Sequence, residues 1–288
     1  MIERKLLTDN NVKVIGTLTD VEVREGSTKD GRDYISGKIT IKSNDKSLQM
    51  HFFSMKLTKS GSVSKLYNTY STLDTLRGHR VEVTGEIDES KIVEGTQLRR
   101  GNTLNAKFIK VISEVDTKAD EASFTFAGFV KDNLACVYEQ DGATVKDYII
   151  TLGQATYNNG MAKYIRFNVD KANSTAINGI QNNFAVGDSI KIEGSLDFNI
   201  ETVTNTTQND FGPDTVKQYQ KSTRRYVINS GKKIVDEFAY TQDEINELAI
   251  AADADDKKAI ADRGNTNTSV APTATAATPR TASQPKLI

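Results

Sequence analysis

The chain is poor in the residues that build redox, metal and catalytic sites. Its 288 residues include one cysteine and two histidines. A single cysteine excludes a disulfide within the chain, and this usage fits a reducing compartment. His51 and His79 lie in different predicted elements, and neither has a Cys, His or carboxylate partner at metal-ligand spacing. The sequence therefore predicts no metal site and no cofactor.

Long apolar runs and catalytic motifs are also missing. No run of about 18 apolar residues occurs, and the N-terminus lacks the apolar core of a signal peptide. We therefore expect a soluble, cytoplasmic protein with no membrane partner. Gly231-Lys232 fails as a phosphate-binding loop, because Tyr226 stands where the first glycine is needed. A Gly-x-Ser-x-Gly elbow is absent. We expect no enzymatic activity.

Charge is distributed unevenly, although the formal net charge is only −1. Residues 236–288 carry a net charge of −4, and residues 1–235 carry +3. A mildly basic body with an acidic appendage favours an anionic partner for the body. Ordinary scatter explains a charge of +3 equally well, so other features must decide.

A glycine-containing strand pattern occurs twice. In residues 78–88 apolar side chains alternate around Gly85, and residues 187–197 repeat the pattern around Gly194. An internal glycine in a period-2 strand permits the sharp bend that closes a small barrel. Because residues 12–18 and 124–130 also match each other, in the same order and at nearly equal separation, the sequence predicts an internal duplication.

The first unit, residues 8–115, reads as five strands with a helix between the third and the fourth. The strands are expected at about 11–24, 33–43, 48–55, 78–88 and 104–111. Apolar residues at 3.6 spacing predict a helix over 62–76, and 89–102 reads as a polar loop. This order is typical of a five-stranded Greek-key barrel of the oligonucleotide/oligosaccharide-binding (OB) type.

The second unit, residues 121–236, repeats that order. Its strands are expected at 124–139, 145–157, 161–170, 187–197 and 219–228, with a helix near 174–184 and a polar loop over 199–216. Thr241 and Glu244 form a capping box, so residues 237–263 should contain an acidic helix. Residues 264–288 are rich in Thr, Ala and Pro without periodicity, and we expect a disordered tail. The predicted fold class is all-β, with two tandem OB-type barrels followed by a helix and a tail.

Binding signals lie on the outer face of strands 2 and 3 and on the neighbouring loops, where an OB barrel receives its ligand. In the first unit this surface should carry Arg24, Arg32, Tyr34, Lys38, His51, Phe53, Arg99 and Arg100. In the second unit it should carry Tyr148, Tyr157, Lys163, Tyr164, Arg166, Tyr219, Lys221, Arg224 and Arg225. Aromatic rings interleaved with cations suit single-stranded nucleic acid, because rings stack on bases while Lys and Arg follow the phosphates.

Several aromatic and basic residues also have an ordinary structural interpretation. Phe53 would equally pack under the helix or against the other barrel, and Arg99 and Arg100 would equally form a solvated pair. Tyr67 and Tyr70 lie at helical spacing, so we expect them in the core rather than on the ligand.

The paired five-strand order, the aromatic and basic faces and the acidic segment before a tail resemble single-stranded DNA-binding proteins built on this barrel. Tandem barrels in one small chain resemble those of bacteriophages, which implies the coating of displaced strands during replication and recombination, here in the host cytoplasm. The resemblance covers about residues 10–262 at the level of architecture. The bacterial family ends in an acidic tip with Pro-Phe, whereas this chain ends in Pro285-Lys286-Leu287-Ile288. The helix in 237–263 is thus the candidate contact for replication or recombination proteins.

Two other functions remain open. A virion or assembly subunit would use the barrels as scaffolds, which the modest charge favours. An RNA-binding module would differ by contacts to 2′-hydroxyl groups, which the sequence does not locate. Oligomeric state, site size and the contribution of each barrel also remain open.

Overall fold

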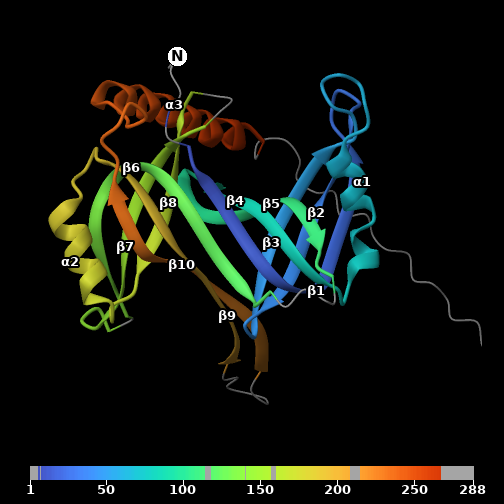
Figure 1. Ribbon diagram of the computed structural model, residues 1–288, viewed down its shortest axis with the longest axis horizontal. Coiled ribbons are helices and arrows are strands. Elements are labelled where there is room, and N and C mark those ends of the chain that lie inside the picture. Colours follow the sequence, from blue (N-terminus) through green and yellow to red (C-terminus); the bar gives the residue numbers. More distant parts are fainter. Residues whose placement is uncertain are drawn as a thin grey trace, which may run out of the picture.

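The computed structural model describes residues 6, 8–113, 118–139, 141–156, 160–207 and 215–266 (Figure 1). Within these ranges, the side chains of 199–203, 205–207, 215, 217–222 and 263–266 lie outside the description.

The first barrel contains β1 (Asn10–Ser27), β2 (Asp33–Ser43), β3 (Lys46–Met55), β4 (Arg80–Glu94) and β5 (Gln97–Val111). β1 pairs antiparallel with both β2 and β4, β2 pairs with β3, and β4 pairs with β5. A parallel contact between His51 of β3 and Asn105 of β5 closes the ring. The helix between β3 and β4 is shorter than predicted, because α1 (Lys65–Ser71) ends at Thr72 and a 3-10 turn (Leu73–Leu76) follows.

The second barrel repeats this closure. It contains β6 (Glu121–Tyr138), β7 (Val145–Ala155), β8 (Ala162–Val169), α2 (Ser174–Asn183), β9 (Ser189–Thr207) and β10 (Thr215–Lys233). β6 pairs with β7 and β9, and a parallel contact between Asn168 and Val227 joins β8 to β10. The predicted all-β class, with two five-stranded rings of OB strand order and a C-terminal helix, is confirmed.

The internal glycines allow the close strand approach that the sequence predicts at the bend of each barrel. A Cβ atom at Gly85 would lie 2.1 Å from the carbonyl oxygen of Asn105, and one at Gly194 would lie 2.1 Å from that of Val227. Only glycine lets these strands cross so closely where each barrel bends. The alternating residues around them, such as Val81 and Val83, are fully buried.

Both predicted polar loops are wrong. Residues 89–102 belong mostly to β4 and β5, which turn at Gly95 with φ +61°, and residues 199–216 belong mostly to β9 and β10. In both stretches apolar residues are few and do not alternate, so the pattern that marks a strand is missing. Cys136, which the apolar pattern of residues 134–138 places in the interior, is exposed near the end of β6.

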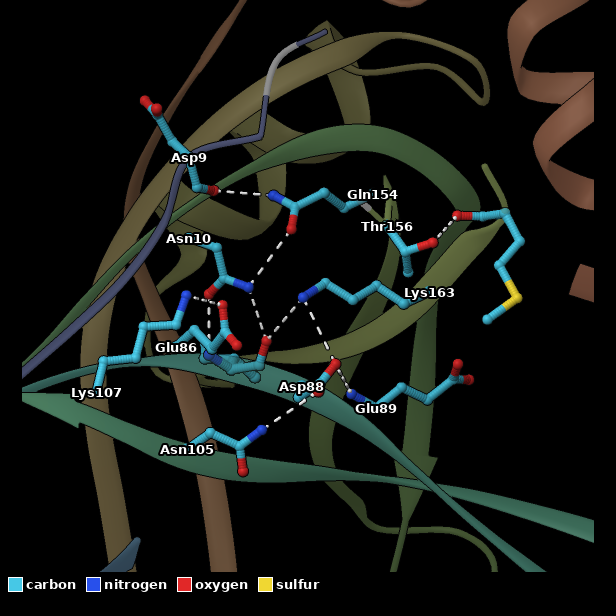
Figure 2. A network of polar contacts seen from close by, with 12 residues as sticks. Asp9, Asn10, Glu86, Asp88, Glu89, Asn105, Lys107, Gln154, Thr156 and Lys163 are labelled. Carbon is cyan, nitrogen blue, oxygen red and sulfur yellow. Dashed lines mark hydrogen bonds and ion pairs between the residues drawn. The ribbon is translucent and has the colours of Figure 1, made fainter. Parts of the chain in front are cut away.

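A continuous sheet joins the two barrels, because β1 also pairs antiparallel with β6. Figure 2 shows the polar network at this junction. The buried amide of Gln154 donates to the carbonyl oxygens of Asp9 at 3.0 Å and Ala127 at 2.7 Å. Asn10 exchanges two hydrogen bonds with the backbone of Ile87, at 2.7 and 2.9 Å. Satisfied polar groups at a buried junction fix one relative placement of the barrels.

The acidic helix α3 (Gln242–Thr266) lies across one end of the second barrel, above β6 and β8 (Figure 1). The capping box is confirmed: the Thr241 amide donates to Glu244 at 2.8 Å, and the Glu244 amide donates to the Thr241 hydroxyl at 3.3 Å. Leu248 and Ala252 are buried against the barrel. In the described part of the chain, no helix is both long enough and apolar enough to span a membrane.

Candidate nucleic-acid interface

Five predicted residues gather on one surface of the first barrel, called here the first face: Arg24, Tyr34, Lys38, His51 and Phe53. Strand register brings them together, because Arg24, Ser36 and Phe53 form one cross-strand row and Glu22, Lys38 and His51 form the next. Arg24 lies within β1 rather than in the predicted loop. The two rows border an open groove of about 330 Å³.

The aromatic residues of the first face are available to a ligand. The side chain of Phe53 is 56 % exposed, so it packs neither under α1 nor against the other barrel. The Tyr34 ring lies beside it with 5.5 Å between ring centroids, in a tilted arrangement. A Cβ atom at Gly26 would lie 2.7 Å from the Tyr34 hydroxyl, so glycine provides the space for this ring. The exposed Phe53 ring, with the half-buried Tyr34 ring beside it, forms a platform on which bases stack.

The charge of the first face is partly neutralised. The ammonium group of Lys38 lies 2.7 Å from the Glu22 carboxylate. Burial lowers the pKa of His51, and the positive charges of Arg224 and Lys38 lower it further. The His51 ring is therefore predominantly neutral at pH 7, which suits stacking better than phosphate binding.

The second barrel contributes a cation to this surface. β9 contacts β3, and Lys46 forms an ion pair with Asp197. Arg224 on β10 donates to the amide oxygen of Gln49 at 3.3 Å, and its guanidinium lies 5.8 Å from the centre of the Phe198 ring. Arg224 thus extends the first face toward the β9–β10 hairpin.

The neighbouring Arg225 has a different role. Its guanidinium lies 2.9 Å from Asp147, 3.3 Å from Asp197 and 3.9 Å from Asp170. The hydrogen bond with the buried carboxylate of Asp147 is the main cause that raises the pKa of Arg225. Arg225 holds strands together. The prediction that it contacts a ligand is therefore wrong.

The corresponding surface of the second barrel is covered. Tyr164 was predicted to stack on bases, but its side chain is only 5 % exposed and packs with Leu248 and Ala252 of α3. Arg100 and Lys131 flank its ring, 5.2 and 4.3 Å from the ring centre. Burial, together with the negative charge of Asp253, raises the pKa of the Tyr164 hydroxyl. The sequence pattern failed here because it contains no signal for a covering helix.

Carboxylates of α3 also occupy the nearby cations. Lys91 lies 2.8 Å from Asp255 and 2.7 Å from Asp256, and Arg100 pairs with Asp256 and Glu89. Burial opposes the charge of Lys91, but the hydrogen bonds to the two aspartates outweigh it and raise its pKa. The predicted phosphate contact of Arg100 is thus taken by protein carboxylates.

The other predicted residues are dispersed or paired. Arg32 pairs with Asp30 at 2.6 Å, and Arg99 with Glu94 at 3.1 Å. Lys163 lies 3.5 Å from Asp88 at the barrel junction (Figure 2), so it connects the barrels instead of facing solvent.

The remaining predicted residues lie mostly in the second unit. Tyr148 is half-buried against the core, whereas the side chain of Arg166 is exposed. Tyr157 lies outside the described residues, as do the side chains of Tyr219 and Lys221. Tyr67 and Tyr70 belong to the core as predicted, and Tyr70 is fully buried.

Sequence reasoning missed Lys91, Lys131 and Gln49. Lys91 pairs across the β4–β5 hairpin with Arg100, a relation that would have been visible had residues 89–102 been read as two strands. Lys131 and Gln49 carry no signal of their own, because only the packing of the barrels and α3 brings them to these surfaces.

Comparisons with known proteins define the family. The YorF family model matches residues 8–266, so the chain belongs to the YorF family. No curated protein matches the chain. The wild-type single-stranded DNA binding protein from Thermus aquaticus is a similar solved structure, with 13 % identity, coverage of 82 % of this chain and 97 % of that one, and a TM-score of 0.44. A Replication Protein A heterotrimer bound to single-stranded DNA aligns at 9 % identity over 76 % of this chain and 49 % of that one, with a TM-score of 0.22.

Proposed function

We propose that this YorF-family protein binds single-stranded DNA through the first face, without catalysis and largely without sequence preference. One observation carries the proposal: the exposed ring of Phe53 and the half-buried ring of Tyr34 lie beside the cations Arg24 and Lys38 across adjacent strands. Stacking on such rings contributes about 1–3 kcal/mol per base for any base, and cations alongside follow the phosphates. Arg224 of the second barrel continues the cationic path.

A titration tests this proposal. Fluorescence anisotropy of a labelled oligo-dT of about 30 nucleotides (dT30) would be measured with the full chain at about 50 and about 300 mM salt. We expect saturable binding that weakens with salt and exceeds binding to a duplex of equal length. Absence of binding at low salt, or tighter binding to the duplex, would contradict the proposal. An oligo-rU of equal length separates DNA from RNA preference.

The biological setting is a further part of the proposal. We propose a role in DNA replication or recombination in the cytoplasm of a bacteriophage host, with α3 contacting other proteins of that process. The exposed side of α3 carries Asp243, Glu247 and Asp253 together with Ile250, which is 71 % exposed. A fluorescent fusion in infected cells would gather at sites of DNA synthesis, and a uniform distribution would argue against this setting.

A scaffold function is the second candidate, because one observation favours it. Most of the cations predicted to contact DNA are paired with carboxylates, including Lys38, Arg99, Arg100 and Arg225. A stable homo-oligomer that binds neither dT30 nor oligo-rU in the same titration would support the scaffold function instead.

A further inference from the structure

The second barrel has a groove between α2 and β10 that the first barrel fills. Strand register makes Gly231 the counterpart of Ile109, because Gly231 pairs with Ile192 and Ile109 pairs with Val83. Ile192 and Val83 occupy the same place, two residues before the internal glycine of their strands. The Ile109 side chain packs against the core of the first barrel, whereas Gly231 leaves space.

The helix differs at the same place. In the first barrel the buried hydroxyl of Tyr70 on α1 donates to the carbonyl oxygens of Ala106 at 2.9 Å and Lys107 at 3.3 Å on β5. In the second barrel α2 turns the small residues Ala176 and Gly179 toward β10. The result is a groove of about 440 Å³, called here the α2–β10 groove.

The α2–β10 groove combines an apolar floor with a basic rim. Ile180, Phe184 and Ile228 supply the apolar side chains. Lys232 and Lys233 line its end, and no carboxylate is among its lining residues. Lys233 is paired with Asp188 at 2.6 Å, while Lys232 is exposed.

One wall of the groove is the edge of a strand. From Ser230 to Lys233, β10 pairs with β9 on one side only. Its pairing with β8 is confined to Val227 among the described residues. An exposed strand edge beside apolar pockets is the arrangement by which a sheet accepts an extended peptide as an added strand.

We propose that the α2–β10 groove binds an extended segment of a protein partner that carries apolar side chains flanked by acidic residues. The exposed Lys232 selects the charge, and the floor selects the apolar side chains. A second copy of this chain fits poorly, because pairing of two β10 edges would bring Lys232 of both copies together. This site is separate from the first face and does not depend on nucleic-acid binding.

A designed peptide tests the proposal. The probe is a fluorescein-labelled peptide with alternating valine and threonine between two aspartates at each end, titrated with the full chain by anisotropy. We expect saturable binding, and weaker binding of a peptide with lysines in place of the aspartates. Gly179→Leu should weaken binding by about tenfold or more, equal to about 1.4 kcal/mol.

The variant is suited to this purpose. A Cβ atom at Gly179 would meet no atom within 4 Å, and leucine is a better helix former than glycine, so the fold should persist. Asn178→Leu, at the exposed neighbouring position on α2, is the matched control and should bind the peptide normally. Both variants should keep the wild-type affinity for dT30.

Three results would overturn the proposal. The first is the absence of saturable binding up to about 1 mM peptide. The second is peptide binding that Gly179→Leu leaves unchanged, and the third is displacement of the peptide by dT30. The last result would assign the groove to nucleic acid. Gly231→Ile, which copies Ile109 of the first barrel, gives an independent check. Its Cβ would lie 3.2 Å from the side chain of Ile192, so its unfolding temperature must first be compared with that of the wild type.

Discussion

The two barrels share a strand order but differ in what lies over their third strands. Phe53 on β3 is 56 % exposed, whereas Tyr164 on β8 is 5 % exposed under α3. The hairpins are placed reciprocally: Arg224 of β10 contacts Gln49 on β3, and Asn102 of β5 contacts the backbone of Arg166 on β8. The two rings therefore present similar surfaces, and α3 covers that of the second barrel while the first face stays open.

The largest contrast between the barrels concerns stability. Tyr164→Ala should lower the free energy of unfolding by about 3 kcal/mol, because it opens a cavity beneath α3. Phe53→Ala should cost less than about 1 kcal/mol, because much of that ring is already in water. Urea unfolding measures both values, and equal losses would show that the two positions are not different environments.

Binding should show the opposite contrast. Phe53→Ala should weaken dT30 binding by about 1–3 kcal/mol, or roughly 5- to 150-fold, because a stacking ring is lost. Phe108→Ala is the matched control, since Phe108 is 65 % exposed on β5 away from the first face. Anisotropy titrations of both variants would decide, and a similar loss for Phe108→Ala would remove the first face from the account.

Removing the α3 carboxylates that pair with cations should make the two barrels more alike in DNA binding. The double variant Asp255→Asn/Asp256→Asn removes both carboxylates from Lys91 and one of the two from Arg100, which keeps Glu89, so dT30 affinity at low salt should rise severalfold and fall more steeply with salt. Asp243→Asn/Glu247→Gln makes the same charge change at exposed positions on α3 and should have a smaller effect. Equal effects of the two double variants would show that α3 affects DNA binding through its net charge and not by covering Lys91 and Arg100.

Adjacent arginines on β10 sharpen the comparison further. Arg224→Ala should weaken dT30 binding by about 1 kcal/mol and reduce the salt slope by about one, as expected for the loss of one phosphate contact. Arg225→Ala should instead lower stability, because it removes the cation paired with the buried Asp147. Salt-dependent titrations and thermal unfolding of both variants separate these outcomes.

The smallest effect concerns pH. Burial and nearby positive charges hold the pKa of His51 below its ordinary value of 6.5, so the ring gains a proton only below that pH. DNA phosphates favour the protonated ring, and dT30 affinity should therefore rise as pH falls below 6.5. His51→Gln should flatten this rise. If the variant keeps the wild-type pH profile, the rise in affinity comes from other titrating groups.

The sequence was sufficient for the strand order and for the first face, because period-2 alternation assigns Tyr34, Lys38 and Phe53 to one side of β2 and β3. It failed at Tyr164, where alternation gives the correct side of β8 but not what covers that side. It also failed at Arg225, since three carboxylates from three other segments meet there only in the folded chain. Local pattern predicts orientation within a strand, and contacts between distant segments decide whether the surface is open.

Hydrogen exchange with and without dT30 distinguishes an open first face from two equivalent binding surfaces. We expect slower exchange over Asp33–Met55, which spans β2 and β3, with little change over Val145–Val169, which spans β7 and β8. Protection confined to β7 and β8, or equal protection of both barrels, would contradict the claim that the first face is the open binding surface.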